Sequence, residues 1–294
     1  MPGMMFTAID HLVLVAPDLA AAAAPYERLG LTLSPVTRHQ GAGTENRALF
    51  VGGLASHFYV ELLGVHDGAL AAATGRGDYL ALTEKGGGAA RLVFECDDLD
   101  DADDRFARHG VVCSRRTVSR EGGEKIADLL LPDTDRAGCR LGLMKYVTPR
   151  AERIAAREAR GLLKHSLSLK RLDHLAIIAP QLDEMTAFWQ KALGVPVFGE
   201  VAGRGMLIKQ MKVGDAVVEL LGPDTPASPL ASRPAGLIPM AAFEVPDLAA
   251  AVAAAVERGF SLPDPAPGVL PGTRTSTISG DQLGGLSLQL LEYV

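Results

Sequence analysis

The alternation of apolar and polar positions predicts a chain that is rich in β-strands, with a few helices between them. Residues 9–16 form an apolar run that ends at a proline, and an alanine-rich stretch at 20–29 follows it. An apolar run of this length is typical of a buried strand, and the alanine-rich stretch is typical of a helix. Gly30 comes directly after that stretch, where glycine is favoured because it tolerates a positive φ.

This unit of strand and helix recurs along the chain. Residues 172–182 repeat the pattern of residues 9–19, and both contain an Asp-His pair; residues 91–99 and 240–248 keep a strand followed by an acidic residue and leucine. Further apolar strands are expected at 47–51, 57–65, 125–131, 140–147, 206–213, 216–222, 273–279 and 286–294. Because repeated patterns of this kind indicate duplicated units, the chain is interpreted as four βαβββ modules paired into two halves.

The modules predict an α+β fold with one half at residues 1–147 and the other at 171–294. Residues 148–170 join the halves, carry many arginines and glutamates, and are expected to form an exposed linker helix. A charge run of this kind usually marks a solvated face, so we expect no functional role for it.

Two polar residues recur at matching places in otherwise apolar strands. His11 precedes Glu61 by 50 positions, and His174 precedes Glu219 by 45. Successive side chains of a strand point to opposite faces, so each glutamate points away from its apolar neighbours. A buried carboxylate is costly unless it is paired or bound to a metal. Two interpretations therefore stay open: a metal-binding pair, and a hydrogen-bonded His–Glu pair without metal.

The repeated modules resemble the vicinal oxygen chelate superfamily, which includes glyoxalase I, methylmalonyl-CoA epimerase, extradiol dioxygenases and antibiotic-resistance proteins. The first half, with the sequence His-Gln-Gly-Ala-Gly-Thr-Glu-Asn-Arg at 39–47, resembles glyoxalase-like domain proteins. The second half resembles the epimerase and glyoxalase modules. The resemblance implies two cup-shaped halves of mixed sheet, with metal ligands on the first and last strands of each module. It does not define the activity, since one fold hosts many chemistries.

By this resemblance, each half keeps one histidine and one glutamate of the ligand positions and lacks the second module's histidine. The implied positions are His11, Glu61, Arg91 and Met144 in the first half, and His174, Glu219, Met240 and Gln289 in the second. One divalent metal (zinc, iron, nickel, cobalt or manganese) is expected in at most one half. The fuller ligand set is His174, Glu219 and Gln289, and the alternative is His11 with Glu61. Glu219 and Glu61 are also the candidate catalytic carboxylates.

The glycine-rich stretch and Arg91 provide the candidate substrate contacts. His39, Thr44 and Asn46 offer polar groups beside glycines that let a ligand approach the backbone, although an ordinary turn favours the same residues. Arg91 supplies a fixed positive charge, which is expected either to pair with Glu61 or to hold an anionic substrate. His39 or His57 could complete a metal site with His11 and Glu61, but His57 is expected at the surface, where its strand starts.

Charge and composition narrow the possible functions. The chain has 29 Lys and Arg against 35 Asp and Glu, a net charge of -6 that argues against nucleic-acid binding. No apolar run reaches the roughly 18 residues that span a membrane, and the first residues lack a signal-peptide pattern, so a cytoplasmic location is expected. Three cysteines without CxxC spacing favour reduced thiols. The expected partner is a small-molecule substrate, and the expected state is a monomer or homodimer.

The resemblance implies an enzyme that acts on a small oxygenated substrate. Metal-assisted enolate chemistry of the isomerase, epimerase or lyase type is the expected reaction. An extradiol ring-cleaving dioxygenase is one alternative, but Met240 and Gln289 stand where that family uses histidine and glutamate. A metal-free small-molecule binding or resistance protein is the other alternative, and the missing ligands favour it.

Overall fold

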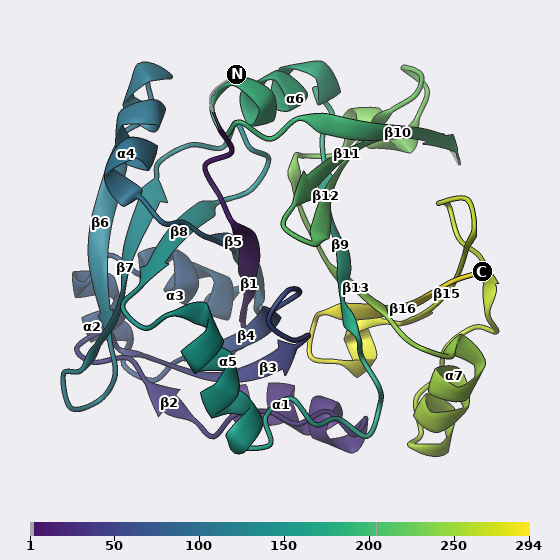
Figure 1. The fold of residues 1–294 in the computed structure, drawn as a ribbon, viewed down its shortest axis with the longest axis horizontal. Coiled ribbons are helices and arrows are strands. Elements are labelled where there is room, and N and C mark those ends of the chain that lie inside the picture. Colours follow the sequence, from purple (N-terminus) through teal and green to yellow (C-terminus); the bar gives the residue numbers. More distant parts are fainter. Residues whose placement is uncertain (1–2, 204) are drawn as a thin grey trace.

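The computed structural model describes residues 3–203 and 205–294, which form two halves joined by one helix (Figure 1). The first half contains β1 (Ala8–Val15), α1 (Leu19–Arg28), β2 (Thr37–Arg38), β3 (Thr44–Val51), β4 (Phe58–Val65), α2 (Gly68–Ala73), α3 (Gly77–Glu84), β5 (Gly88–Glu95), α4 (Leu99–Arg108), β6 (Cys113–Ser119), β7 (Lys125–Pro132) and β8 (Leu141–Tyr146). The joining helix is α5 (Arg150–Ala159). The second half contains β9 (Arg171–Ile178), α6 (Leu182–Lys191), β10 (Val197–Gly203), β11 (Met206–Val213), β12 (Ala216–Pro223), β13 (Gly236–Glu244), α7 (Leu248–Glu257), β14 (Ala266–Pro267), β15 (Thr273–Ile278), β16 (Ser287–Tyr293) and two short 3-10 helices, Pro229–Ser232 and Gly280–Gln282.

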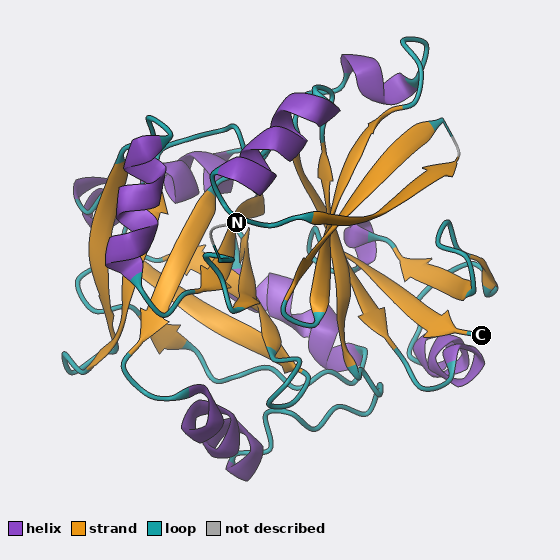
Figure 2. Ribbon diagram, turned by 45° about the horizontal axis from the view of Figure 1, so that its top comes forward, coloured by secondary structure: helices purple, strands orange, loops and turns teal. Residues whose placement is uncertain are grey.

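Each half is one curled sheet of eight strands, and the two sheets have the same topology. The orders are β2-β3-β4-β1-β5-β8-β7-β6 and β10-β11-β12-β9-β13-β16-β15-β14. In the first sheet the central strands β1 and β5 are antiparallel, β4 runs parallel to β1, and β8 runs parallel to β5. The second sheet repeats this arrangement around β9 and β13. The predicted four βαβββ modules and the α+β fold are therefore confirmed, with the strands of each half forming one sheet and the helices lying outside it (Figure 2).

Aspartates at the ends of strands begin three of the four module helices. Asp18, Asp98 and Asp247 are the N-caps of α1, α4 and α7, and their side-chain oxygens accept backbone N–H groups at 2.8–3.1 Å. An N-cap of this kind satisfies donors that the first helical turn leaves free. The acidic residue and leucine that recur in the sequence thus mark the point where each of these strands gives way to a helix.

One continuous hydrophobic core joins the two halves. Trp189 of α6 is fully buried, its ring stands edge-on to Phe94 of β5 at 6.0 Å, and its Nε1 donates to the Ala137 carbonyl at 3.1 Å. Gly138 has a φ of +79°, and a Cβ there would lie 2.6 Å from Ile177 of β9. Glycine therefore lets the β7–β8 loop of the first half lie directly against the second. No helix within the described ranges is long and apolar enough to cross a membrane.

Candidate functional site

The concave face of the first sheet, which we call the first cup, carries His11, Glu61 and Arg91. His11 and Val13 are two residues apart on β1, and Val13 pairs with Glu61 of β4 and with Arg91 of β5. Paired residues and residues two apart share a face of the sheet, so the three polar side chains lie on the same side. They line a cavity of about 550 Å³, a size usual for small-molecule sites.

His11 is held in a fixed orientation by Asp10. The pairing of β1 with β5 shifts register between Ile9 and His11, and this bulge brings the carboxylate of Asp10 next to the ring. The Nδ1 of His11 donates to Asp10 Oδ2 at 2.7 Å, and the Tyr146 hydroxyl donates to the same oxygen at 2.7 Å. Burial opposes ionisation of Asp10, but the hydrogen bond and charge of His11 outweigh it and hold the pKa of Asp10 below its ordinary value. The Nε2 of His11 therefore faces the cup, 3.6 Å from Glu61 Oε2.

The other oxygen of Glu61 is held by residues of the glycine-rich stretch. Asn46 Nδ2 donates to Glu61 Oε1 at 2.5 Å and lies 3.2 Å from His39 Nε2, while His39 Nδ1 lies 2.9 Å from Thr44 Oγ1. Burial is the main cause that lowers the pKa of His39, which favours its neutral form. These contacts assign the proton to Nδ1, which donates to Thr44. The structure thus brings His39, Thr44 and Asn46 together around Glu61.

Arg91 lines the cup, but its guanidinium bonds to neighbours other than Glu61. Its Nη1 donates to the Leu141 carbonyl at 2.6 Å, and its Nη2 pairs with Asp78 of α3 at 3.2 Å. The side chain is buried, with 6% of the residue exposed, so it does not extend to the surface. From the sequence, Arg91 is expected either to pair with Glu61 or to hold an anionic substrate. The structure shows no ion pair with Glu61, and binding of an anionic substrate stays a prediction.

Strand register corrects one ligand position implied by the sequence. Phe94 and Phe243 are equivalent in the repeat, and the residues before them pair with Gly142 and Gln289 respectively. Gly142, rather than Met144, is therefore the counterpart of Gln289. A Cβ at Gly142 would lie 3.2 Å from Leu129 Cδ1 and 3.3 Å from Arg91 Cδ, so a ligand side chain there would begin in tight contact with the arginine stem.

The concave face of the second sheet, the second cup, repeats the first arrangement in part. His174 Nδ1 bonds to Asp173 at 2.8 Å, and its Nε2 lies 3.9 Å from Glu219 Oε2. Burial would lower the pKa of His174, but the bond to Asp173 and the charge of Glu219 outweigh it and raise the pKa. Gln210 Nε2 donates to Glu219 Oε1 at 2.9 Å. Gln289 lies on the same face, since both it and His174 pair with Ala242.

The joining helix α5 forms a wall of the first cup. Arg153 is buried and its guanidinium lies 3.5 Å from the centre of the Tyr146 ring, while that of Arg157 lies 4.1 Å from the centre of the Phe50 ring. These arginines and Arg160 line the cavity. The expectation of a merely solvated charged face is therefore wrong. The spacing of Arg153, Arg157 and Arg160, at i, i+4 and i+7, is the signal in the sequence that they share one helix face.

His57 is buried beside this helix, which corrects its expected place at the surface. Only 4% of the residue is exposed, and its Nε2 contacts Arg157 Nη1 instead of joining His11 and Glu61. Burial and then the positive charge of Arg157 lower the pKa of His57 to about 3. An unfolded histidine titrates near 6.5, so between about pH 3 and 6.5 the unfolded chain binds a proton that the folded chain does not.

Substituting His57 is expected to remove part of the acid sensitivity of the fold. Stability rises with pH wherever the unfolded state binds more protons, so His57 contributes a slope of up to about 1.4 kcal/mol per pH unit below pH 6.5. We expect His57→Gln to lose this slope in urea unfolding at pH 4.5, 5.5 and 6.5. His66→Gln, at an exposed position, should keep it. Equal slopes in wild type and His57→Gln would contradict the assignment.

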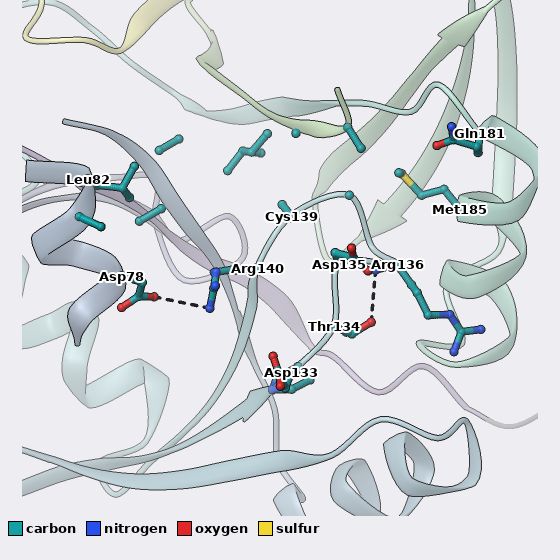
Figure 3. A pocket seen from close by; sticks show the side chains of 18 of the residues that line it. Asp78, Leu82, Asp133, Thr134, Asp135, Arg136, Cys139, Arg140, Gln181 and Met185 are labelled. Carbon is teal, nitrogen blue, oxygen red and sulfur yellow. Dashed lines mark hydrogen bonds and ion pairs between the residues drawn. The ribbon is translucent and has the colours of Figure 1, made fainter. Parts of the chain in front are cut away.

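A larger cavity of about 1320 Å³ lies between the halves (Figure 3). It is lined by α3 and the β7–β8 loop of the first half and by α6 and β13 of the second. The β7–β8 loop contributes both acidic residues, Asp133 and Asp135, and basic residues, Arg136 and Arg140, to the lining of the cavity. This mixed lining contains no histidine and neither of the repeated glutamates, so the first cup is the stronger candidate for chemistry.

Comparison with known families agrees with this architecture. Residues 9–161 match the family described as glyoxalase-like domain, and residues 173–275 match the glyoxalase/bleomycin resistance protein/dioxygenase superfamily. The chain belongs to the vicinal oxygen chelate superfamily. A comparison with curated protein sequences yields no match.

Some solved structures are similar to this chain over nearly its whole length, and others over about half of it. A mutant of 4-hydroxymandelate synthase from Streptomyces coelicolor is 16% identical, covers 99% of this chain and 93% of its own, and has a TM-score of 0.64. A hypothetical protein from Staphylococcus aureus is 12% identical, covers 97% and 98%, and has a TM-score of 0.64. Methylmalonyl-CoA epimerase from Mycobacterium tuberculosis is 25% identical over 46% of this chain and 95% of its own, with a TM-score of 0.41. The first two likenesses show the shared fold.

The first cup does not fit the metal centre that the superfamily implies. Two of its four ligand positions hold Arg91 and Gly142, and Asn46 already donates to one oxygen of Glu61. Catalytic metal sites usually use three protein ligands. Within residues 3–203 and 205–294, no group of three His, Cys, Asp or Glu side chains could hold a metal.

Proposed function

We propose that the first cup moves a proton on a small substrate that carries a carbonyl group, with Glu61 as the base. The observation that carries this proposal is the placement of the Glu61 carboxylate, which is buried in the cavity and faces the Nε2 of His11. The other two carboxylates that line the cavity, Glu124 and Glu152, are exposed. Glu61 is therefore the cavity carboxylate that a bound substrate would meet away from bulk water.

The chemistry follows from the neighbours of Glu61. The carboxylate removes a proton from the carbon next to the carbonyl, and the electron pair of that C–H bond moves onto the carbonyl oxygen to give an enolate. His11 Nε2 can take the proton from Glu61, and the carboxylate of Asp10 stabilises the imidazolium that forms. Return of the proton to another carbon or to the other face gives an isomer or epimer. The wall that α5 forms limits the access of water to the enolate.

Proton exchange measured by NMR tests this proposal. The protein, treated with EDTA, is incubated in D2O with a panel of small 2-oxo and 3-oxo acids, and deuterium incorporation next to the carbonyl is followed. Exchange that survives chelation supports a base that works without metal. Exchange that requires an added divalent ion would favour the metal-assisted reaction of the superfamily instead. Binding without any exchange would favour a small-molecule binding or resistance protein.

A further inference from the structure

Two arginines in the wall of the first cup have no acidic partner in the part of the chain that the structure describes. Arg76 lies at the start of α3 and Arg116 lies on β6, and both line the cavity with Glu61 and His39. Arg116 Nη2 donates to the Gly75 carbonyl at 2.7 Å, and Arg76 Nη1 donates to the Thr74 carbonyl at 3.2 Å. Each guanidinium has five N–H donors, so most of them stay available to a ligand.

Nearby arginines do have carboxylate partners. Arg115, the neighbour of Arg116 on the other face of β6, pairs with Asp100 at 2.6 Å and Asp103 at 3.1 Å. Arg120 at the rim of the cavity pairs with Glu124 at 3.4 Å. These arginines thus each have an ion pair, whereas Arg76 and Arg116 have none within the described residues.

The local electrostatics favour an anion beside these two residues. Burial and then the positive charge of Arg116 lower the pKa of Arg76, and they outweigh the nearby negative charges of Asp78 and Glu61. Burial is the main cause of the low pKa of His39, to which the charge of Arg76 also contributes. Two like charges held together in a partly desolvated wall disfavour the empty site, and a bound anion relieves both the repulsion and the loss of solvation. Like charges that lie close together and destabilise the empty site are typical of binding sites.

We propose that Arg76 and Arg116 form an anion subsite that takes a carboxylate or phosphate group of the substrate. This inference rests on the proposed function, because the anionic group belongs to the same substrate that meets the Glu61 carboxylate in this cavity. Apolar side chains of Val13, Leu63 and Val93 also line the cavity and suit the carbon body of an organic acid or phosphate ester. Guanidinium groups match the planar, two-oxygen edge of such anions.

Binding of two simple probes tests the subsite. Inorganic phosphate and malonate are titrated into wild type, Arg76→Gln and Arg116→Gln by calorimetry, at constant ionic strength set with sodium chloride. We expect at least one probe to bind wild type, and each substitution to weaken it tenfold or more. The stronger probe distinguishes a phosphate from a carboxylate substrate. Arg115→Gln removes the same charge from the other face of β6 and should leave the affinity unchanged.

Thermal unfolding provides a second measurement that does not depend on tight binding. Since the two charges repel each other in the empty site, Arg76→Gln and Arg116→Gln should have a Tm at least equal to that of wild type without anion. Both variants should also lose the rise in Tm that the probe causes.

No binding of either probe to wild type would overturn the proposal, as would equal weakening by Arg115→Gln. Proton exchange in Glu61→Gln tests the base, and probe binding tests the subsite. Because the two are measured separately, failure of the subsite and failure of the proposed reaction are distinguishable.

Discussion

Replacing Glu61 by glutamine is expected to slow proton exchange at least a hundredfold while leaving the cavity intact. General bases typically contribute about 10²–10⁴-fold to the rate, and an amide of the same size cannot accept the proton. The amide oxygen of the new side chain can still accept the hydrogen bond from Asn46 Nδ2, so the contacts around His39 and Thr44 should persist. The measurement is the rate of deuterium incorporation by NMR, with anion binding by calorimetry as a check that the site survives.

Glu219→Gln is the matched control for this prediction. Glu219 occupies the equivalent place in the second cup, faces His174 and accepts a hydrogen bond from Gln210. The same change there removes the same charge and should leave exchange within about twofold of wild type. An equal loss in both variants would assign the chemistry to neither cup alone. Full activity in Glu61→Gln with a loss only in Glu219→Gln would move the reaction to the second half.

The repeat in the sequence predicts the fold because it consists of patterns that act over a few neighbouring residues. Apolar runs mark the buried central strands, and the aspartates after β1, β5 and β13 are N-caps whose effect depends only on the next few residues. The outer strands β6 and β10 are missed because they lie at or near sheet edges and carry polar residues on exposed positions. The short helices α2 and α3 are missed as well, since α3 is placed by its packing on β1, β4 and β5, and α2 packs on α3.

The candidate site is predictable only in its central pair. His11 and Glu61 meet because the repeat fixes their strands and alternation fixes their face. The choice of Asp78 as the partner of Arg91 depends on where α3 lies, which no spacing along the chain reveals. The role of α5 could not be predicted for the same reason. A row of arginines on a helix usually indicates a solvent-exposed face, and only its position in the fold shows that it lines a cavity.

Removing the carboxylate of Glu95 is expected to lower the free energy of unfolding by about 3–5 kcal/mol, the usual cost of leaving a buried charge without its partner. Glu95, at the end of β5, accepts from Arg153 at 2.7 Å and from Arg150 at 2.9 Å, so it holds α5 against the first half. The Arg153 side chain is 8% exposed, and Asp10 at 3.9 Å is too distant to replace the lost bond. Urea unfolding of Glu95→Ala measures the loss.

The repeat supplies a control for this buried ion pair. Glu244 is the equivalent of Glu95 in the second half, but its partners Lys170 and Arg171 have side chains that are 52% and 28% exposed, and Arg171 also bonds to Asp173. Glu244→Ala should therefore cost only about 1 kcal/mol. The double variant Glu95→Ala, Arg153→Met should recover part of the loss, because an apolar side chain leaves no unpaired charge. Equal costs for the two glutamates, or no recovery in the double variant, would show that α5 is held by its apolar contacts instead.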